Sequence, residues 1–188
     1  MTNHANLLDA GNSLLGIIDM QSRLYAAMPE LDAAGMALHT NRLLAAVKLL
    51  SVPVILTEQY PEGLGATIPE IAGNAPADCR VFRKTAFSCA AVDEFRQALA
   101  DSGRRQIVLA GQEAHICVLQ TTLDLLHLGY QVYVVEDAVC SRRPEHKAWA
   151  LRRMQQQGAT IICHESVLFE WLKDSKHADF KVISSLLR

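Results

Sequence analysis

The chain lacks most features that mark a disulfide scaffold, a zinc knuckle or a membrane segment. Its five cysteines are odd in number and form no Cys-x-x-Cys pair, which argues against the first two and predicts a reducing compartment. No apolar run is long enough to span a bilayer, and no basic stretch followed by an apolar core opens the sequence. We therefore expect a cytoplasmic protein without a membrane partner.

Excess positive charge is also absent. The formal net charge is −2, and no stripe of stacking aromatics accompanies the few basic pairs, so we expect no nucleic-acid partner. No Gly-x-Gly-x-x-Gly follows the first apolar run and no Gly-Lys-Ser/Thr occurs, which argues against a nucleotide-binding or flavodoxin-like domain.

The 188 residues have the size of one domain, and we expect 1–188 to form a single one. Short apolar runs alternate with longer amphipathic ones, which predicts an α/β fold with a parallel sheet covered on both faces. The expected strands cover 14–19, 52–57, 81–82, 107–110, 131–135 and 159–163. The expected helices cover 36–50, 92–100, 117–128 and 144–157, with a last short one capped by Ser166.

Three strand ends carry chemically useful side chains: Asp19, Lys84 and Cys117. Open α/β sheets place reactive groups at the carboxyl ends of their strands. Cys117 also precedes a helix, whose dipole favours thiolate over thiol. Taken singly, each residue has an ordinary alternative role: a turn-forming aspartate, a solvated lysine or a small core cysteine. Together they predict a cysteine hydrolase.

The chain resembles the isochorismatase-like cysteine hydrolase family, and most closely its poorly characterised isochorismatase-domain branch. The likeness covers about residues 14–172. It is carried by Ile-Ile-Asp-Met-Gln ending at Gln21, Phe-Arg-Lys-Thr-Ala-Phe-Ser ending at Ser88, Gly-Gln-Glu-Ala-His-Ile-Cys-Val ending at Val118, and Glu-Asp-Ala-Val-Cys-Ser-Arg ending at Arg142. Thr57 to Gly65 also matches that branch.

The resemblance implies a three-layer α/β/α sandwich whose six strands lie in the order 3-2-1-4-5-6. It implies that Asp19 acts as general base and then acid, that Lys84 orients and stabilises charge, and that Cys117 attacks an electrophilic carbon. It also implies a cis peptide between Gln112 and Glu113, with the backbone N–H groups of Glu113 and Cys117 forming an oxyanion hole. The expected substrate is a small molecule with an amide-type C–N bond, and no cofactor is expected.

The sequence departs from the family pattern in two places. The nicotinamidase branch has an Asp-x-His metal site after its second strand, whereas this chain has Glu58-Gln-Tyr60 there and no histidine between His39 and His115, so we expect no metal. Glu113 stands where a smaller residue is common; its carboxylate would disfavour anionic substrates if it faced the pocket, but it could equally face away.

Substrate contacts are less clearly marked. Gln21, Tyr60 and His115 are the candidates, although packing or surface exposure is the commoner role for a residue in the position of His115. A catalytically idle interaction or oligomerisation module is the alternative function. We also expect a homo-oligomer, because Leu64, Ile68 and Ile71 in the 58–79 loop and the apolar segment 167–172 exceed what the core requires.

Overall fold

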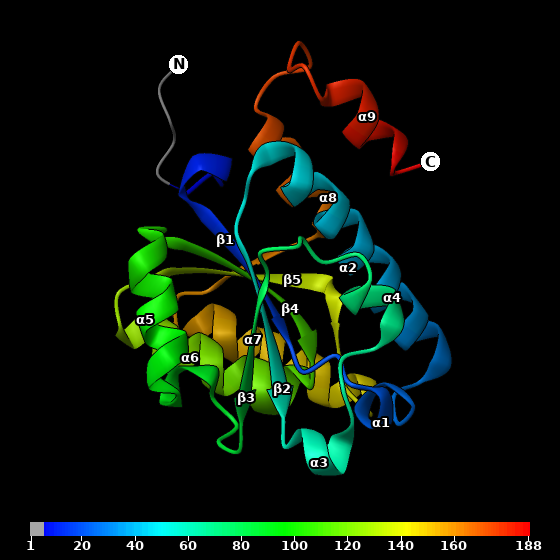
Figure 1. Cartoon of the computed structure of the whole chain (residues 1–188), viewed down its shortest axis with the longest axis vertical. Helices are drawn as coiled ribbons and strands as arrows, with labels where there is room; N and C mark the ends of the chain where they lie inside the picture. Colours follow the sequence, from blue (N-terminus) through cyan, green and yellow to red (C-terminus); the bar gives the residue numbers. More distant parts are fainter. Residues whose placement is uncertain (1–5) are drawn as a thin grey trace.

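A single parallel sheet forms the centre of the molecule. The computed structural model describes residues 6–188, and its strands lie in the order β3-β2-β1-β4-β5-β6, which confirms the predicted topology (Figure 1). The strands are β1 (Ser13–Ile18), β2 (Val54–Gln59), β3 (Arg80–Lys84), β4 (Gln106–Gln112), β5 (Gln131–Cys140) and β6 (Thr160–Ile162). Every residue of β1, β2 and β4 is buried, as expected for central strands covered on both faces.

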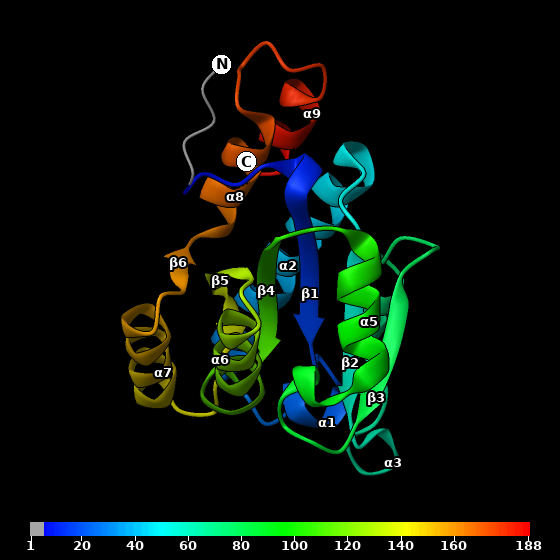
Figure 2. The same ribbon diagram turned by 90° about the vertical axis from the view of Figure 1, so that its left-hand side faces the viewer.

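Helices cover both faces of the sheet and make the three layers. Helices α2 and α8 pack with one apolar cluster, and α5, α6 and α7 pack with the other (Figure 2). The helices are α1 (Ser22–Tyr25), α2 (Glu30–Leu50), α3 (Pro61–Leu64), α4 (Pro69–Ala72), α5 (Asp93–Ser102), α6 (Leu119–His127), α7 (Pro144–Gln156), α8 (His164–Leu172) and α9 (Phe180–Ser185). Short 3₁₀ turns lie at Ala10–Asn12 and Cys89–Ala91. Within residues 6–188, no helix is both long and apolar enough to cross a membrane.

Element boundaries differ from the sequence prediction where distant residues cap an element. Helix α8 begins at His164 rather than after a Ser166 cap, because Asp137 of β5 accepts a 2.8 Å hydrogen bond from the His164 backbone N–H. Helix α6 is preceded by a π-helical turn, Ala114–Val118, which contains Cys117. Strand β5 extends to Cys140, past an irregular register opposite β4. None of these features has a local sequence signal.

The expectation of an apolar, exposed loop after β2 is wrong. Ile71 is fully buried and Ile68 nearly so, both packed into the same cluster as α2. The loop is held back on its own chain because the Ile68 N–H donates to Met20 O at 2.9 Å and Glu58 accepts from both the backbone and the hydroxyl of Thr67. In 167–172 only Phe169 and Glu170 retain appreciable exposure. Neither segment therefore supplies the apolar contact surface on which the oligomer was predicted.

Candidate active site

The carboxyl edge of the sheet brings Asp19 and Lys84 together. Asp19 follows β1 directly, has a positive φ of 49° and is completely buried. Its Oδ1 accepts a hydrogen bond from the Thr57 hydroxyl at 2.7 Å, and its Oδ2 accepts from Lys84 Nζ at 2.6 Å. The parallel arrangement explains the meeting, since β1, β2 and β3 are successive neighbours and end at the same edge. A buried carboxylate is thereby paired and hydrogen-bonded, as its charge requires.

Lys84 is the only positive charge in contact with Asp19 among the described side chains. Its ammonium group also donates to Gln59 Oε1 at 2.7 Å and to the Phe87 carbonyl at 3.0 Å. Burial is the largest single influence and lowers the pKa of Lys84, but the charge of Asp19, the thiols of Cys89 and Cys117 and the hydrogen bond to Asp19 together raise it more, so the net pKa is raised. Lys84 therefore stays cationic and neutralises the aspartate.

Cys117 lies in the π-helical turn after β4 and is only 5% exposed. Burial raises the pKa of the Cys117 thiol, and the neighbouring negative charge of Asp19 raises it further, whereas Lys84 lowers it by less. The net direction is opposite to the one that the helix dipole alone predicts. The structure holds a thiol next to a carboxylate that can accept its proton.

A second buried thiol lies beside this pair. Cys89 is fully buried, its Sγ is 3.6 Å from the Thr57 hydroxyl, and burial and the charge of Asp19 raise its pKa to about 11. Its placement depends on the turn after β3, which no local pattern predicts.

The loop between β4 and Cys117 is anchored by an ion pair. The peptide bond between Gln112 and Glu113 is cis. The Glu113 carboxylate accepts from Arg142 Nε at 3.0 Å and from the Arg142 backbone N–H at 3.1 Å. The charge of Glu113 is therefore paired by Arg142. His115, whose pKa is lowered by burial, contacts the Ser141 hydroxyl through Nδ1 at 3.0 Å.

The other two candidate substrate contacts, Gln21 and Tyr60, differ in how exposed their side chains are. Gln21 is fully buried and all its side-chain bonds are internal, to the Gln59 backbone and to the Gly65 carbonyl. Both polar atoms of the Gln21 side chain therefore already have partners within the protein. Tyr60 is 53% exposed and has left-handed backbone geometry after β2, so it stays a candidate.

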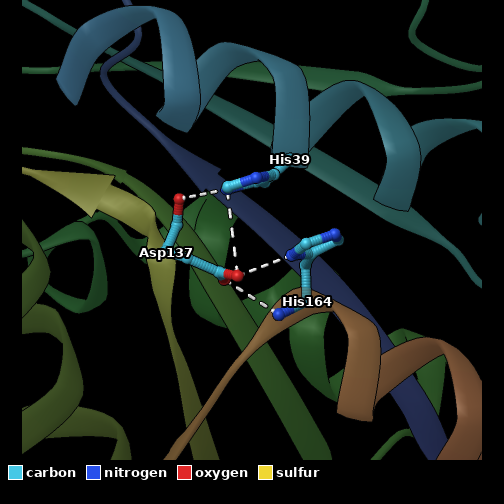
Figure 3. Close-up of side chains that lie close together, drawn as sticks. All are labelled: His39, Asp137 and His164. Carbon is cyan, nitrogen blue, oxygen red and sulfur yellow. Dashed lines mark hydrogen bonds and ion pairs between the residues drawn. The ribbon is translucent and has the colours of Figure 1, made fainter. Parts of the chain in front are cut away.

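One group of described side chains could hold a metal, and it lies apart from this pair. His39 of α2, Asp137 of β5 and His164 of α8 converge in Figure 3. Asp137 Oδ2 is 2.6 Å from His164 Nδ1, which is a hydrogen-bond distance, and the two imidazole rings are stacked 4.1 Å apart at 10°. Parallel rings cannot both direct a nitrogen lone pair at one ion. Arg42 also lies 3.1 Å from His164 Nε2. The group is built as a hydrogen-bonded clamp between α2, β5 and α8.

The parallel sheet has the strand order 3-2-1-4-5-6, and its carboxyl edge carries a buried Asp–Lys pair with a thiol beside it. Together the fold and this edge place the chain in the class of α/β folds of the hydrolase type. Residues 13–166 match the model of the isochorismatase domain, and the chain belongs to that family. Isochorismatase domain-containing protein 2 of Xenopus laevis is 39% identical over 181 residues, which cover 94% of this chain and 83% of the relative.

Solved structures show the same fold. The MAR1 ribonuclease of Caenorhabditis elegans superposes with a TM-score of 0.90 at 34% identity and covers 96% of this chain and 92% of its own. The YcaC gene product of Escherichia coli, described as an octameric hydrolase of unknown specificity, has a TM-score of 0.90 at 24% identity and covers 99% and 91%.

Proposed function

We propose that the chain is a cysteine hydrolase that cleaves an amide-type C–N bond in a small molecule through a covalent thioester. The observation that carries this proposal is the buried Asp19 carboxylate, which is paired with Lys84 at 2.6 Å and lies close enough to Cys117 for its charge to raise the pKa of that thiol. One group is thus positioned to take the thiol proton, and a fixed cation balances its charge. A purely structural ion pair would not require an adjoining thiol.

In the first half of the reaction, Cys117 Sγ attacks the substrate carbonyl carbon while its proton passes to Asp19. The backbone N–H groups of Glu113 and Cys117 stabilise the resulting oxyanion. Collapse breaks the C–N bond, and Asp19 returns the proton to the departing amine. A raised pKa of the resting thiol suits this route, because the proton leaves only as the sulfur–carbon bond forms.

In the second half, water attacks the thioester carbon and gives its proton to Asp19. The acid product leaves with the added oxygen, and Asp19 returns the proton to the Cys117 sulfur. Lys84 remains cationic throughout, because Asp19, Gln59 and the carbonyls of Ala86 and Phe87 accept its protons. Each turnover consumes one water and restores the starting protonation states.

The alternative functions receive less support. A catalytically idle module would not need a paired aspartate in contact with a buried thiol. The C. elegans relative is called a ribonuclease, but the formal charge of −2 on this chain offers no electrostatic attraction for a polyanion. We therefore favour a small neutral amide as the substrate.

A panel of small amides and ureas tests the proposal with wild-type protein, Cys117→Ala and Cys163→Ala. Cys163 is exposed and remote from Asp19 in the fold, so its replacement serves as the matched control. We expect Cys117→Ala to lose several orders of magnitude in kcat, about 10⁴-fold or more, and Cys163→Ala to keep wild-type activity. Hydrolysis that survives in Cys117→Ala would disprove a Cys117 nucleophile.

We also propose that the chain forms a homo-oligomer. The support is the octameric assembly named for the YcaC structure and one exposed aromatic site on this surface. Trp149 of α7 is 63% exposed and lies beside His146, at a hollow also lined by His115 and Leu119. A large exposed indole next to further apolar surface is typical of a contact between subunits.

A further inference from the structure

Besides Asp19, Lys84 is hydrogen-bonded to one other side chain, Gln59, which has no role of its own in the proposed mechanism. A lysine ammonium has three protons and no acceptor, so a fixed direction requires three partners. Here the nearest three are Asp19 Oδ2, Gln59 Oε1 and the Phe87 carbonyl, with the Ala86 carbonyl farther away at 3.4 Å. The lysine side chain is only 1% exposed. Gln59 is the sole uncharged side chain among these partners.

The amide of Gln59 is itself held in one orientation. Its Nε2 donates to the Thr85 carbonyl at 2.7 Å, so its Oε1 faces Lys84. The reverse orientation would press an NH₂ group against the ammonium. The Gln59 backbone is fixed as well, because its N–H donates to Gln21 Oε1 at 2.7 Å and its carbonyl accepts from Gln21 Nε2 at 3.0 Å. Gln21 and Gln59 therefore form a rigid support under Lys84.

We propose that Gln59 is a positioning residue that, through Lys84, fixes the Asp19 carboxylate against the Cys117 thiol. The inference rests on the proposed function. Gln59 supplies an acceptor without a charge, so the Asp19–Lys84 pair remains electrically balanced. A glutamate at this position would supply the same acceptor and also place a second negative charge near the thiol, which would disfavour the thiolate.

The first test needs no substrate. Cys117 is alkylated with iodoacetamide across a pH series in wild-type protein, Gln59→Glu and Gln59→Met, and the exposed Cys163 of the same molecule reports the general reactivity. Each cysteine is followed by peptide mass spectrometry. We expect Gln59→Glu to slow Cys117 about ten-fold at a given pH, equal to a rise of about one pKa unit. Gln59→Met should instead speed it, because an Asp19 carboxylate that is no longer held against the thiol raises the pKa of Cys117 less.

The matched control is Gln106→Met. Gln106 is another buried glutamine with backbone partners, but it lies at the start of β4, at the opposite edge of the sheet. Its loss should lower stability without changing the pH profile of Cys117. If Gln106→Met shifts the Cys117 profile as much as the Gln59 variants do, or if Gln59→Glu or Gln59→Met leaves the profile at the wild-type position, the proposal is overturned.

Once a substrate is found, kinetics supply a second readout. Gln59→Met should lower kcat by up to about 100-fold with little change in KM, because a displaced base impairs the chemical step rather than binding. The role of Gln59 and the proposed hydrolase function can be disproved independently of each other. A shifted Cys117 profile without hydrolysis of any amide would leave the role of Gln59 standing and remove the proposed function. Hydrolysis that is insensitive to Gln59→Met would do the reverse.

Discussion

At the residue scale, one carboxylate has two opposing influences on the thiol. Asp19 raises the pKa of Cys117 in the resting protein through its charge, yet in the proposed mechanism it removes the thiol proton during attack. The proposed nucleophile is therefore a thiol and not a preformed thiolate. In that mechanism it becomes nucleophilic only when a carbonyl carbon is within reach, which would protect a nearly buried sulfur from unrelated electrophiles.

Asp19→Asn should separate these two influences. With the carboxylate gone, burial still raises the pKa of Cys117, but Lys84 alone then acts on it electrostatically, and Lys84 lowers it. We expect alkylation of Cys117 by iodoacetamide at about pH 8 to accelerate by about ten-fold or more, while hydrolysis of a substrate is lost because no base remains. Cys163 serves as the internal reference. Slower alkylation of Cys117 in Asp19→Asn would contradict this account.

The sequence predicts the acidic and basic members of the site better than their supports. Asp19 and Lys84 each follow an apolar run, and neighbouring parallel strands end at one edge, so their meeting follows from topology. The partners Thr57 and Gln59 lie inside β2 and look like ordinary strand residues. Their role depends on side-chain directions across the sheet, and the raised pKa of Cys117 depends on burial that only tertiary packing creates.

At the element scale, the contact between β1 and β4 determines how closely the loop between β4 and Cys117 approaches Asp19. Gly111 pairs with Ile18 and has a φ of +113°. A Cβ at Gly111 would lie 2.0 Å from the Ile18 carbonyl oxygen and 2.7 Å from its nitrogen. Both obstacles are backbone atoms in the middle of the sheet. Only glycine permits this approach, one residue before the cis peptide.

Gly111→Ala should therefore be severely destabilising. We expect the free energy of unfolding to fall by at least about 3 kcal/mol, from the disallowed φ and the forced separation of the strands. Gly35→Ala is the matched control, since Gly35 lies inside α2 and an added Cβ meets nothing within 4 Å. That change should stabilise the protein by about 0.5–1 kcal/mol through helix propensity. Urea unfolding measures both, and equal effects would refute the argument.

Most elements were predictable from their periodicity, but their ends were not. Apolar alternation located all six strands, whereas α2 begins at Glu30, six residues before the start of its apolar repeat. The start of α2, residues 30–35, is largely exposed and contains two alanines and a glycine, so its apolar spacing is weak. In the 58–79 loop the error concerned burial: apolar residues that were expected to be exposed are buried. Ile68 and Ile71 looked surplus to a six-stranded core, yet the cluster around α2 has room for them.

At the scale of the whole molecule, burial of these segments shifts the expected subunit contact elsewhere. Charged substitution of Ile68 would now disrupt the core rather than separate subunits. The remaining large exposed apolar side chains include Leu31, Leu38, Trp149 and Val182. Trp149 differs from the others because it continues an aromatic row through His146 to His115, close in sequence to Cys117. A subunit contact there would lie near the catalytic turn.

We expect light scattering of wild-type protein to give a mass that is a multiple of the 20.7 kDa chain. Trp149→Glu should reduce that mass, because burying a carboxylate in an apolar contact is unfavourable unless it is paired. Leu31→Glu is the control: Leu31 is 87% exposed at the start of α2, on the other face of the sheet, and its replacement should leave the mass unchanged. Quenching of Trp149 fluorescence by acrylamide should rise as the assembly dissociates on dilution, whereas buried Trp171 should remain protected. A monomeric mass at micromolar concentration would contradict the assembly, and an oligomer that persists in Trp149→Glu would place the contact elsewhere.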